Sequence, residues 1–355
     1  MIYPQPLAPG TCVGLIAPAS PVTPQERRNC EICLRSLGFR VITGESLKRD
    51  DNLYGYLAGT AIDRANDINY MFADPGVEAI FCVRGGYGSS QVLPYLDYDC
   101  IRRNPKIFVG YSDVTSLHTV LQRYCGLVTF HGPMVKPDLC RQTRMDACGI
   151  ESEKHAEQEK DSRLKISEEY MLRSLFTALS GNASWVFENP PGEKLRVLVP
   201  GYAQEILTGG NLSVLARSLG TPYAPNADGK ILFLEDIGES VSRIHMYLMQ
   251  MQYAGVFQGV RGILLGDFTD CSGVAMDTSG SAEKSSGSGQ LWTIEKLLED
   301  FFKKLRIPVI GNVCSDHRYP MGTLPFGMFC VIETPEGEIP RIEFGRHEHE
   351  WCYHS

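Results

Sequence analysis

The residues with the clearest chemical potential lie in the segment 106–125, KIFVGYSDVTSLHTVLQRYC. An apolar run at 107–109 stops at Gly110, Ser112 follows, and apolar residues then recur at helical spacing from Val114 onward. A serine on a sharp strand-to-helix turn lifts its hydroxyl out of the sheet, and the helix N-terminus below it favours developing negative charge. Ser112 is therefore a candidate nucleophile.

The same turn has a plainer interpretation. Serine and aspartate are common at helix starts, where their side chains cap free N–H groups. The five-residue elbow motif G-x-S-x-G is also incomplete, because Val114 stands at its last position. The local sequence alone leaves both roles open for Ser112.

A nucleophilic serine needs a base and a group that orients the base. His118 lies on the same predicted helix as Ser112 and would point elsewhere, whereas His131 follows an apolar run and is a rival base. His317 sits in a loop rich in glycine and proline, and such loops hold a side chain in a fixed pose. Acidic candidates are Glu235 and Asp236, at the end of the strand-like run ILFLEDIG.

A glycine-rich loop, Arg84-Gly85-Gly86-Tyr87-Gly88, follows another predicted strand. Its backbone N–H groups can approach a ligand closely and donate to an oxyanion. A dinucleotide site is disfavoured, because G-x-G-x-x-G fails at Gln91 and no G-K-[ST] follows. A tight loop without any ligand is the remaining alternative.

The elements that must position these residues alternate between strand and helix over the first 140 residues. Strand-like runs at 12–17, 39–42, 79–83 and 107–109 are separated by helical patterns at 24–37 and 61–73. This alternation predicts an α/β fold, with a parallel sheet covered by helices on both faces. Ligands of such sheets lie beyond the carboxyl ends of the strands, so the 84–88 loop and the Ser112 turn are expected to converge there.

The second half of the chain predicts a further α/β domain. We expect an N-terminal domain over 1–180 that carries the nucleophile, a linker over 181–200, and a smaller C-terminal domain over 201–355 that carries the acid and the base. The linker is predicted from the segment NPPGEK at 189–194. The low-complexity run at 272–289 predicts a flexible surface loop.

Composition excludes several classes of function. The chain has 355 residues, 43% of them hydrophobic and 21% charged, as in soluble globular proteins of about two domains. A net charge of −8 argues against nucleic acid or an anionic membrane as the main partner. No signal peptide or membrane-spanning stretch is evident, so we expect a cytoplasmic protein whose 12 cysteines are mostly reduced and buried. The C-x-x-C of Cys30 and Cys33 lies mid-helix without a second pair, which favours packing over a redox or metal site.

Several motifs together resemble the LD-carboxypeptidases, the murein tetrapeptide carboxypeptidases of peptidase family S66. They occur in order between about residues 10 and 335, and seven in sequence are far more specific than any one. They are RGGYGS at 84–89, LPYLD at 93–97, GYSD at 110–113, HGP at 131–133, GGNL at 209–212, LED at 234–236, and His317 with LPFG at 324–327.

The resemblance implies a two-domain serine peptidase whose N-terminal parallel-sheet domain is Rossmann- or flavodoxin-like. By the same resemblance Ser112 is the nucleophile, Glu235 the orienting acid and His317 the general base. The oxyanion hole would use the backbone N–H groups of Asp113 and of Gly86 or Gly85. Two departures from the family pattern are Asp316, where glycine is frequent, and the 272–289 run, which looks like an insertion.

The expected function is removal of the terminal D-Ala from murein tetrapeptides in cell-wall recycling, with no cofactor and no metal. Arg84 and Gly85 are candidate substrate-binding residues, although Arg84 is equally suited to an ion pair within its domain. One alternative within the family is hydrolysis of peptidyl or acyl-sulfamoyl adenylates, which gives immunity to microcin C-type antibiotics. Another is a non-catalytic protein that binds a small molecule. The resemblance also implies a homodimer.

Overall fold

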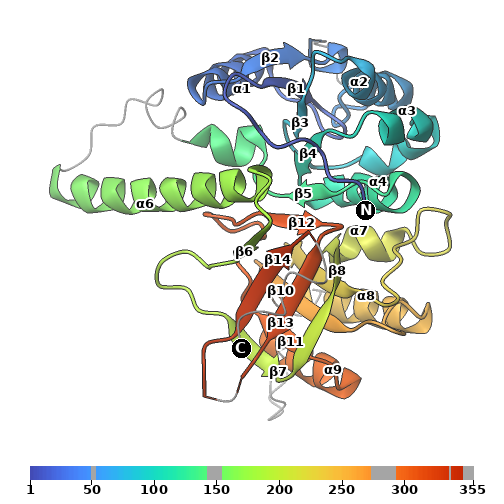
Figure 1. Cartoon of the computed structure of the whole chain (residues 1–355), viewed down its shortest axis with the longest axis vertical. Helices are drawn as coiled ribbons and strands as arrows, with labels where there is room; N and C mark the ends of the chain where they lie inside the picture. The colour runs from blue at the N-terminus through green and yellow to red at the C-terminus, as the bar shows by residue number, and fades with distance from the viewer. Residues whose placement is uncertain (49–52, 142–153, 273–292, 336, 347–355) are drawn as a thin grey trace, which may run out of the picture.

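Two sheets stacked end to end form the molecule, and helices cover both (Figure 1). The computed structural model describes residues 1–48, 53–141, 154–272, 293–335 and 337–346, with the side chains of 154–163 left aside. The first sheet lies in the upper half of Figure 1 and the second in the lower half, with helix α6 extending to one side at their junction. The mixed α/β class expected from the alternating pattern is confirmed.

The first sheet has five parallel strands and one antiparallel edge strand. Its order is β2-β1-β3-β4-β5-β12, and the order β2-β1-β3-β4-β5 is that of flavodoxin-like folds. The chain therefore reverses direction across the sheet between β1 and β3, where such folds bind ligands. The strands are β1 Cys12–Ile16, β2 Arg40–Thr43, β3 Ala79–Cys82, β4 Ile107–Gly110, β5 Thr129–His131 and β12 Leu324–Phe326.

Helices cover both faces of this sheet, as predicted. One face packs against α1 and α6, and the other against α2, α3 and α4. Both α1 and α2 begin with a threonine that forms a capping box with an acidic residue three positions later, which satisfies free N–H groups at the helix start. The helices are α1 Pro24–Ser36, α2 Ala61–Ala73, α3 Tyr98–Arg103, α4 Thr115–Cys125 and α6 Lys154–Leu179. None of the helices that the structure describes is both long and apolar enough to cross a membrane.

The second sheet has eight strands in the order β6-β14-β13-β8-β9-β10-β11-β7. Strands β8 to β11 are parallel, and antiparallel strands flank them on both sides. Helices α7 Leu212–Arg217, α8 Val241–Tyr253 and α9 Ile294–Phe302 pack on one face. The strands are β6 Ser184–Val186, β7 Arg196–Val199, β8 Tyr202–Asn211, β9 Ile231–Ile237, β10 Gly262–Thr269, β11 Val309–Gly311, β13 Phe329–Glu333 and β14 Arg341–Gly345.

Two predicted segments need comment. The range 181–200, predicted as a linker, contains strands β6 and β7, which occupy the two edges of the second sheet. The predicted flexible loop at 272–289 lies outside the described residues, apart from Ser272.

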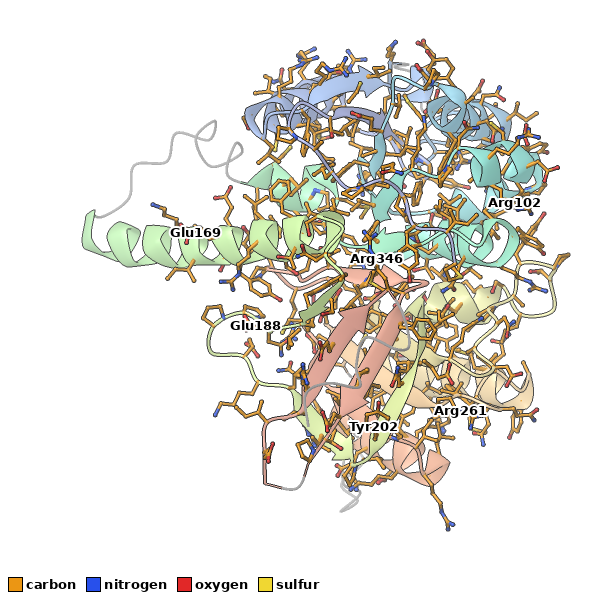
Figure 2. All side chains as sticks on the ribbon, viewed as in Figure 1. Arg102, Glu169, Glu188, Tyr202, Arg261 and Arg346 are labelled. Atoms are coloured by element: carbon orange, nitrogen blue, oxygen red, sulfur yellow. The ribbon has the colours of Figure 1, made fainter. Side chains whose placement is uncertain are left out.

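The two halves are joined by more than a linker. Strand β12 belongs to the C-terminal half of the chain, yet it pairs with β5 of the first sheet, with Leu324 opposite His131. Near the chain ends, Tyr3 donates a hydrogen bond of 3.0 Å to the carbonyl of Arg346, whose guanidinium lies over the Tyr3 ring. Arg346 lies close to the junction of the two halves in Figure 2.

The parallel pairing of β8 with β9 depends on a glycine. Gly209 has a φ of +136°, and a Cβ placed there would lie 2.0 Å from the carbonyl oxygen of Phe233 on β9. We expect Gly209→Ala to destabilise the protein by about 3 kcal/mol, because the backbone is strained and the two strands must separate. Gly229 also has a positive φ but open space around it, so Gly229→Ala is expected to cost only about 1 kcal/mol. Urea unfolding followed by circular dichroism measures both; equal costs would contradict the close approach.

Candidate active site

Ser112 lies on a strained turn at the carboxyl end of β4. Its φ is +63°, a conformation that non-glycine residues adopt rarely and that is typical of nucleophile elbows. His118, six residues further along on α4, donates from Nε2 to the Gly110 carbonyl at 2.8 Å and accepts at Nδ1 from Thr129 at 2.8 Å. Burial lowers the pKa of His118 to about 4, so its ring is a neutral support for the turn. His118 points away from Ser112, as the sequence predicted.

A chain of hydrogen bonds joins Ser112 to residues of the other half. Nε2 of His317 lies 3.0 Å from the Ser112 hydroxyl, and Nδ1 of His317 lies 2.7 Å from a carboxylate oxygen of Glu235. Both distances are within the range over which a base activates a nucleophile and an acid orients the base. The three side chains come from the turn after β4, the loop after β11, and β9, so the two halves must be docked for the arrangement to exist.

Glu235 is fully buried, and Gly266 makes room for it. A Cβ at position 266 would lie 2.8 Å from Cβ of Glu235. Only one carboxylate oxygen has a hydrogen-bond partner among the described residues, namely Nδ1 of His317, while Oε1 has none. A buried carboxylate without other donors interacts strongly with the imidazole, because little water screens its charge.

The charge state of His317 follows from this pairing. Burial lowers the pKa of His317, but the charge of Glu235 and its hydrogen bond raise it, and the resulting pKa lies above the ordinary value for histidine. The ring of Tyr111 packs edge-on against the imidazole, with the ring centres 5.0 Å apart. The arrangement therefore stabilises an imidazolium, which is the state the base enters when it takes a proton.

The His317 loop is fixed at both ends. It runs from β11 in the second sheet to β12 in the first. Next to the histidine, the buried carboxylate of Asp316 accepts hydrogen bonds of 2.8 Å from the backbone N–H groups of Asp267 and Arg318. Asp316, flagged in the sequence only as a departure from the family, thus ties the loop to β10.

His131 supports the same loop from below. Its Nε2 donates to the carbonyl of Ser315 at 3.1 Å, and burial lowers its pKa well below the ordinary value. No hydrogen bond between described residues links His131 to Ser112. The structure therefore places His131 as a neutral support of the His317 loop.

The glycine-rich loop lies directly against the serine. A Cβ at Gly85 would be 3.1 Å from Cβ of Ser112 and 3.4 Å from the backbone nitrogen of Asp113. Gly86 has a φ of +112° and passes so close to Ser20 that a Cβ would collide with its hydroxyl. Within the described part of the chain, no hydrogen bond uses the N–H of Gly86. The loop thus lies against the serine with the N–H of Gly86 unused among the described residues, and an oxyanion site needs such a donor.

Asp113 and Arg64 hold this loop in place. The Asp113 carboxylate accepts a 2.8 Å hydrogen bond from the N–H of Ser89, and the Ser89 hydroxyl donates to the Asp113 carbonyl. Burial raises the pKa of Asp113. The fully buried guanidinium of Arg64 donates to the carbonyls of Pro18 and Gly88, at 2.5 and 2.8 Å. Arg64 was not singled out from the sequence, since an arginine in a helical pattern is usually solvated.

Arg84 is half-buried beside the loop. Its Nη1 donates a hydrogen bond of 3.5 Å to the carbonyl of Pro21, and no ion pair between described residues includes it.

Asp236 does not share the role of its neighbour. It accepts from Asn211 at 3.1 Å and from the N–H of Ser213 at 2.8 Å, which anchors the start of α7. Burial, with the nearby charge of Glu235, raises the pKa of Asp236 to about 6. The backbone N–H of Asn211 in turn donates to the hydroxyl of Thr115 on α4, at 3.0 Å across the junction.

Family models match both halves of the chain. The N-terminal domain of the LD-carboxypeptidases matches residues 13–132, and the C-terminal domain matches residues 205–332. A probable murein peptide carboxypeptidase of Bacillus subtilis is 34% identical over 94% of this chain and 92% of its own length. The murein tetrapeptide carboxypeptidase of Pseudomonas aeruginosa is 30% identical over 90% of this chain and 92% of its own length. The chain belongs to the LD-carboxypeptidase family, peptidase family S66.

Solved structures share the fold. The microcin C7 self-immunity protein MccF, in complex with glutamyl sulfamoyl guanosine, superposes with a TM-score of 0.77 over 97% of this chain and 98% of its own, at 23% identity. A muramoyltetrapeptide carboxypeptidase from Oxalobacter formigenes has a TM-score of 0.72 and 24% identity, over 94% of this chain and 99% of its own.

The pairing of Glu235 with His317 makes a prediction about titration. In Glu235→Gln the imidazolium loses its negative partner, so the pKa of His317 is expected to fall below its value in the unaltered protein. The pKa is measured by NMR titration of the histidine Cε1–H signals. His118, which has no contact with Glu235, is the internal control and keeps its pKa of about 4. An unchanged or raised pKa of His317 would contradict the pairing.

Proposed function

We propose that this protein is a serine-type LD-carboxypeptidase that removes the terminal D-Ala from murein tetrapeptides by a Ser112–His317–Glu235 triad. The observation that carries the proposal is the hydrogen-bonded chain from the strained serine through the imidazole to a buried carboxylate. The family membership and the curated relatives named as murein peptide carboxypeptidases support the substrate class.

The mechanism follows from the distances. Nε2 of His317 takes the proton of the Ser112 hydroxyl as Oγ attacks the carbonyl carbon before the terminal residue. Glu235 keeps Nδ1 protonated and stabilises the imidazolium that forms. The imidazolium then gives its proton to the leaving amine, D-Ala departs, and an acyl-enzyme remains. Water, deprotonated by His317, releases the acyl peptide and restores the serine.

The tetrahedral intermediate needs donors at its oxyanion. We assign this role to the backbone N–H groups of Gly86 and Asp113, because the glycine-rich loop meets the serine at that point. An exopeptidase must also recognise the free terminal carboxylate. Arg84, together with the backbone at Gly85, is the candidate, since its guanidinium lies beside the loop without an acidic partner among the described residues.

A second class of substrate is to be assayed in parallel with the murein tetrapeptide. The microcin C7 self-immunity protein of Escherichia coli is 28% identical over 95% of this chain. Because the alignment covers 95% of this chain and 95% of that relative, and a structure of the relative holds aspartyl sulfamoyl adenosine, an acyl-sulfamoyl adenylate is the second candidate substrate. Release of D-Ala from a murein tetrapeptide without cleavage of the adenylate supports the carboxypeptidase, and the reverse result supports the adenylate.

The triad predicts the effect of two substitutions. Ser112→Ala and His317→Ala are each expected to lower kcat for D-Ala release by at least about 10⁴-fold, as removal of nucleophile or base does in other triads. His245→Ala, at an exposed position on α8, is the control and should keep full activity. The assay is chromatographic detection of released D-Ala, with circular dichroism to confirm folding. Unchanged turnover in Ser112→Ala would contradict the mechanism, and activity retained in His317→Ala would transfer the base role to His131.

A further inference from the structure

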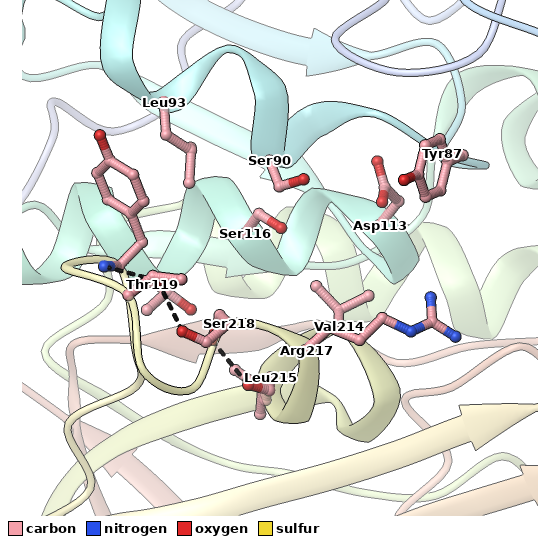
Figure 3. A pocket seen from close by; sticks show the side chains of 12 residues that line it. Tyr87, Ser90, Leu93, Asp113, Ser116, Thr119, Val214, Leu215, Arg217 and Ser218 are labelled. Atoms are coloured by element: carbon pink, nitrogen blue, oxygen red, sulfur yellow. Dashed lines mark hydrogen bonds between the residues drawn. The ribbon is translucent and has the colours of Figure 1, made fainter. Parts of the chain in front are cut away.

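The two residues that flank the nucleophile have different surroundings. Asp113 helps to line a cavity of about 350 Å³ at the junction, where side chains from both halves face each other (Figure 3). Tyr111 is not part of that lining, and only 4% of its surface is exposed. The partners of the Tyr111 side chain are therefore protein groups rather than solvent.

Asp138 is a buried carboxylate that the mechanism does not use. It lies in the short π-helix η5, Val135–Leu139, which follows β5, and it is 7% exposed. Its Oδ2 accepts a hydrogen bond of 2.9 Å from the N–H of Met134, in the same segment. Its Oδ1 accepts from the hydroxyl of Tyr111 at 3.5 Å. One oxygen thus fixes Asp138 locally, and the other is directed at the turn that carries Ser112.

Tyr111 connects this carboxylate to the catalytic base. Its ring packs edge-on against the imidazole of His317, with the ring centres 5.0 Å apart, and lies 5.9 Å from the ring of His131. The phenol is held at its root by the nucleophile turn and at its hydroxyl by Asp138. A ring fixed at both ends restricts the orientation of the imidazole that it contacts.

The charge of Asp138 also acts on His317. Burial raises the pKa of Asp138 to about 6, and the positive charge of His317 lowers it. Such an interaction is reciprocal, so an ionised Asp138 favours the imidazolium over the neutral imidazole. At pH 7 most of the Asp138 carboxylate is ionised, because its pKa lies below that pH.

Other charged groups surround the same pair. Burial lowers the pKa of His317, and three further carboxylates raise it: Glu235, Asp236 and Asp316. The ring of His131 is neutral, because burial lowers its pKa. Arg141, which follows η5, is a second positive group that lowers the pKa of Asp138. Asp138 therefore adds to the effect of the other carboxylates on His317 and does not replace it.

We propose that Asp138 is a second carboxylate of the active site, a positioning residue that acts on His317 through Tyr111. It holds the phenol ring against the imidazole and adds negative charge near the base. The inference rests on the proposed function, in which His317 is the general base. Glu235 orients the imidazole by a direct hydrogen bond of 2.7 Å, and Asp138 supports the same ring from the side of the nucleophile turn.

The first test is NMR titration of His317 in the full chain. We expect Asp138→Asn to lower the pKa of His317 by at least about 0.5, because a negative neighbour of the imidazolium is removed while the shape is kept. The matched control is Asp67→Asn, at another buried carboxylate, whose hydrogen bonds go to Glu45 and Ser46. It should leave the pKa of His317 unchanged. An unchanged or raised pKa in Asp138→Asn, or an equal fall in both variants, would overturn the inference.

The reciprocal measurement needs no change at Asp138, so it does not depend on the folding of Asp138→Asn. The carboxyl carbon of Asp138, followed by ¹³C NMR, is expected to titrate with a pKa of about 6 in the unaltered chain. In His317→Gln the positive neighbour is lost, so the pKa of Asp138 is expected to rise. A pKa of Asp138 that stays the same or falls would contradict the interaction.

Kinetics tests the hydrogen bond between Tyr111 and Asp138. Tyr111→Phe keeps the ring and removes the hydroxyl, so kcat for D-Ala release is expected to fall at least about threefold, with KM changed less than about twofold. The matched control is Tyr98→Phe, at a half-buried tyrosine of α3 whose hydroxyl donates to the carbonyl of Leu93 at 2.8 Å. It should keep kcat. A loss confined to KM, or an equal loss of kcat in both variants, would overturn the role of Tyr111.

The titrations separate this inference from the proposed function, because they need no turnover. The expected pKa changes in a protein that releases no D-Ala would support the pairing of Asp138 with His317 and contradict the carboxypeptidase. Release of D-Ala without those pKa changes would support the carboxypeptidase and contradict the role of Asp138.

Discussion

The loop that carries His317 connects the two sheets, and the candidate site depends on its attachment at both ends. It leaves the second sheet at β11 and enters the first sheet as β12, where three residues pair antiparallel with β5. The ladder fixes the loop relative to β4 and its strained serine, because β4 and β5 are neighbours in the same sheet. A hydrogen-bond distance of 3.0 Å between Ser112 and His317 thus reflects strand pairing as well as contact between side chains.

Other interactions fix the position of the two halves relative to each other. Asn211 donates from its backbone to Thr115, and Gly210 passes so close to Thr115 that a Cβ there would lie 2.5 Å from the hydroxyl. Asn211 also pairs with Glu235 in the parallel ladder of β8 and β9. Asn211 therefore links two features directly. It pairs with the strand that carries Glu235, and it forms the contact that docks the second sheet on α4.

Much of this arrangement can be predicted from the sequence, and the remainder depends on pairing between strands that are far apart in the sequence. The hydrophobic alternation predicts strands β1 to β4 and helices α1 and α2, since local period and caps determine them. The convergence of the 84–88 loop with Ser112 follows from the rule that parallel strands end at one edge. Strands β6, β7 and β12 are short, and their pairing depends on partners more than 90 residues away, so no local pattern predicts them. The roles of Glu235 and His317 were predicted only from the resemblance to a family. The local sequence around an acid or a histidine does not show whether it contacts a serine in another domain.

The central claim is that Ser112 is a nucleophile activated across the junction. Its most direct measurement is covalent labelling of the full chain with a serine-directed fluorophosphonate, followed by peptide mapping with mass spectrometry. The account predicts one phosphonylated site, Ser112, and loss of the label in His317→Ala at the same pH. A label on another serine, no label on the unaltered protein, or undiminished labelling of His317→Ala would contradict it.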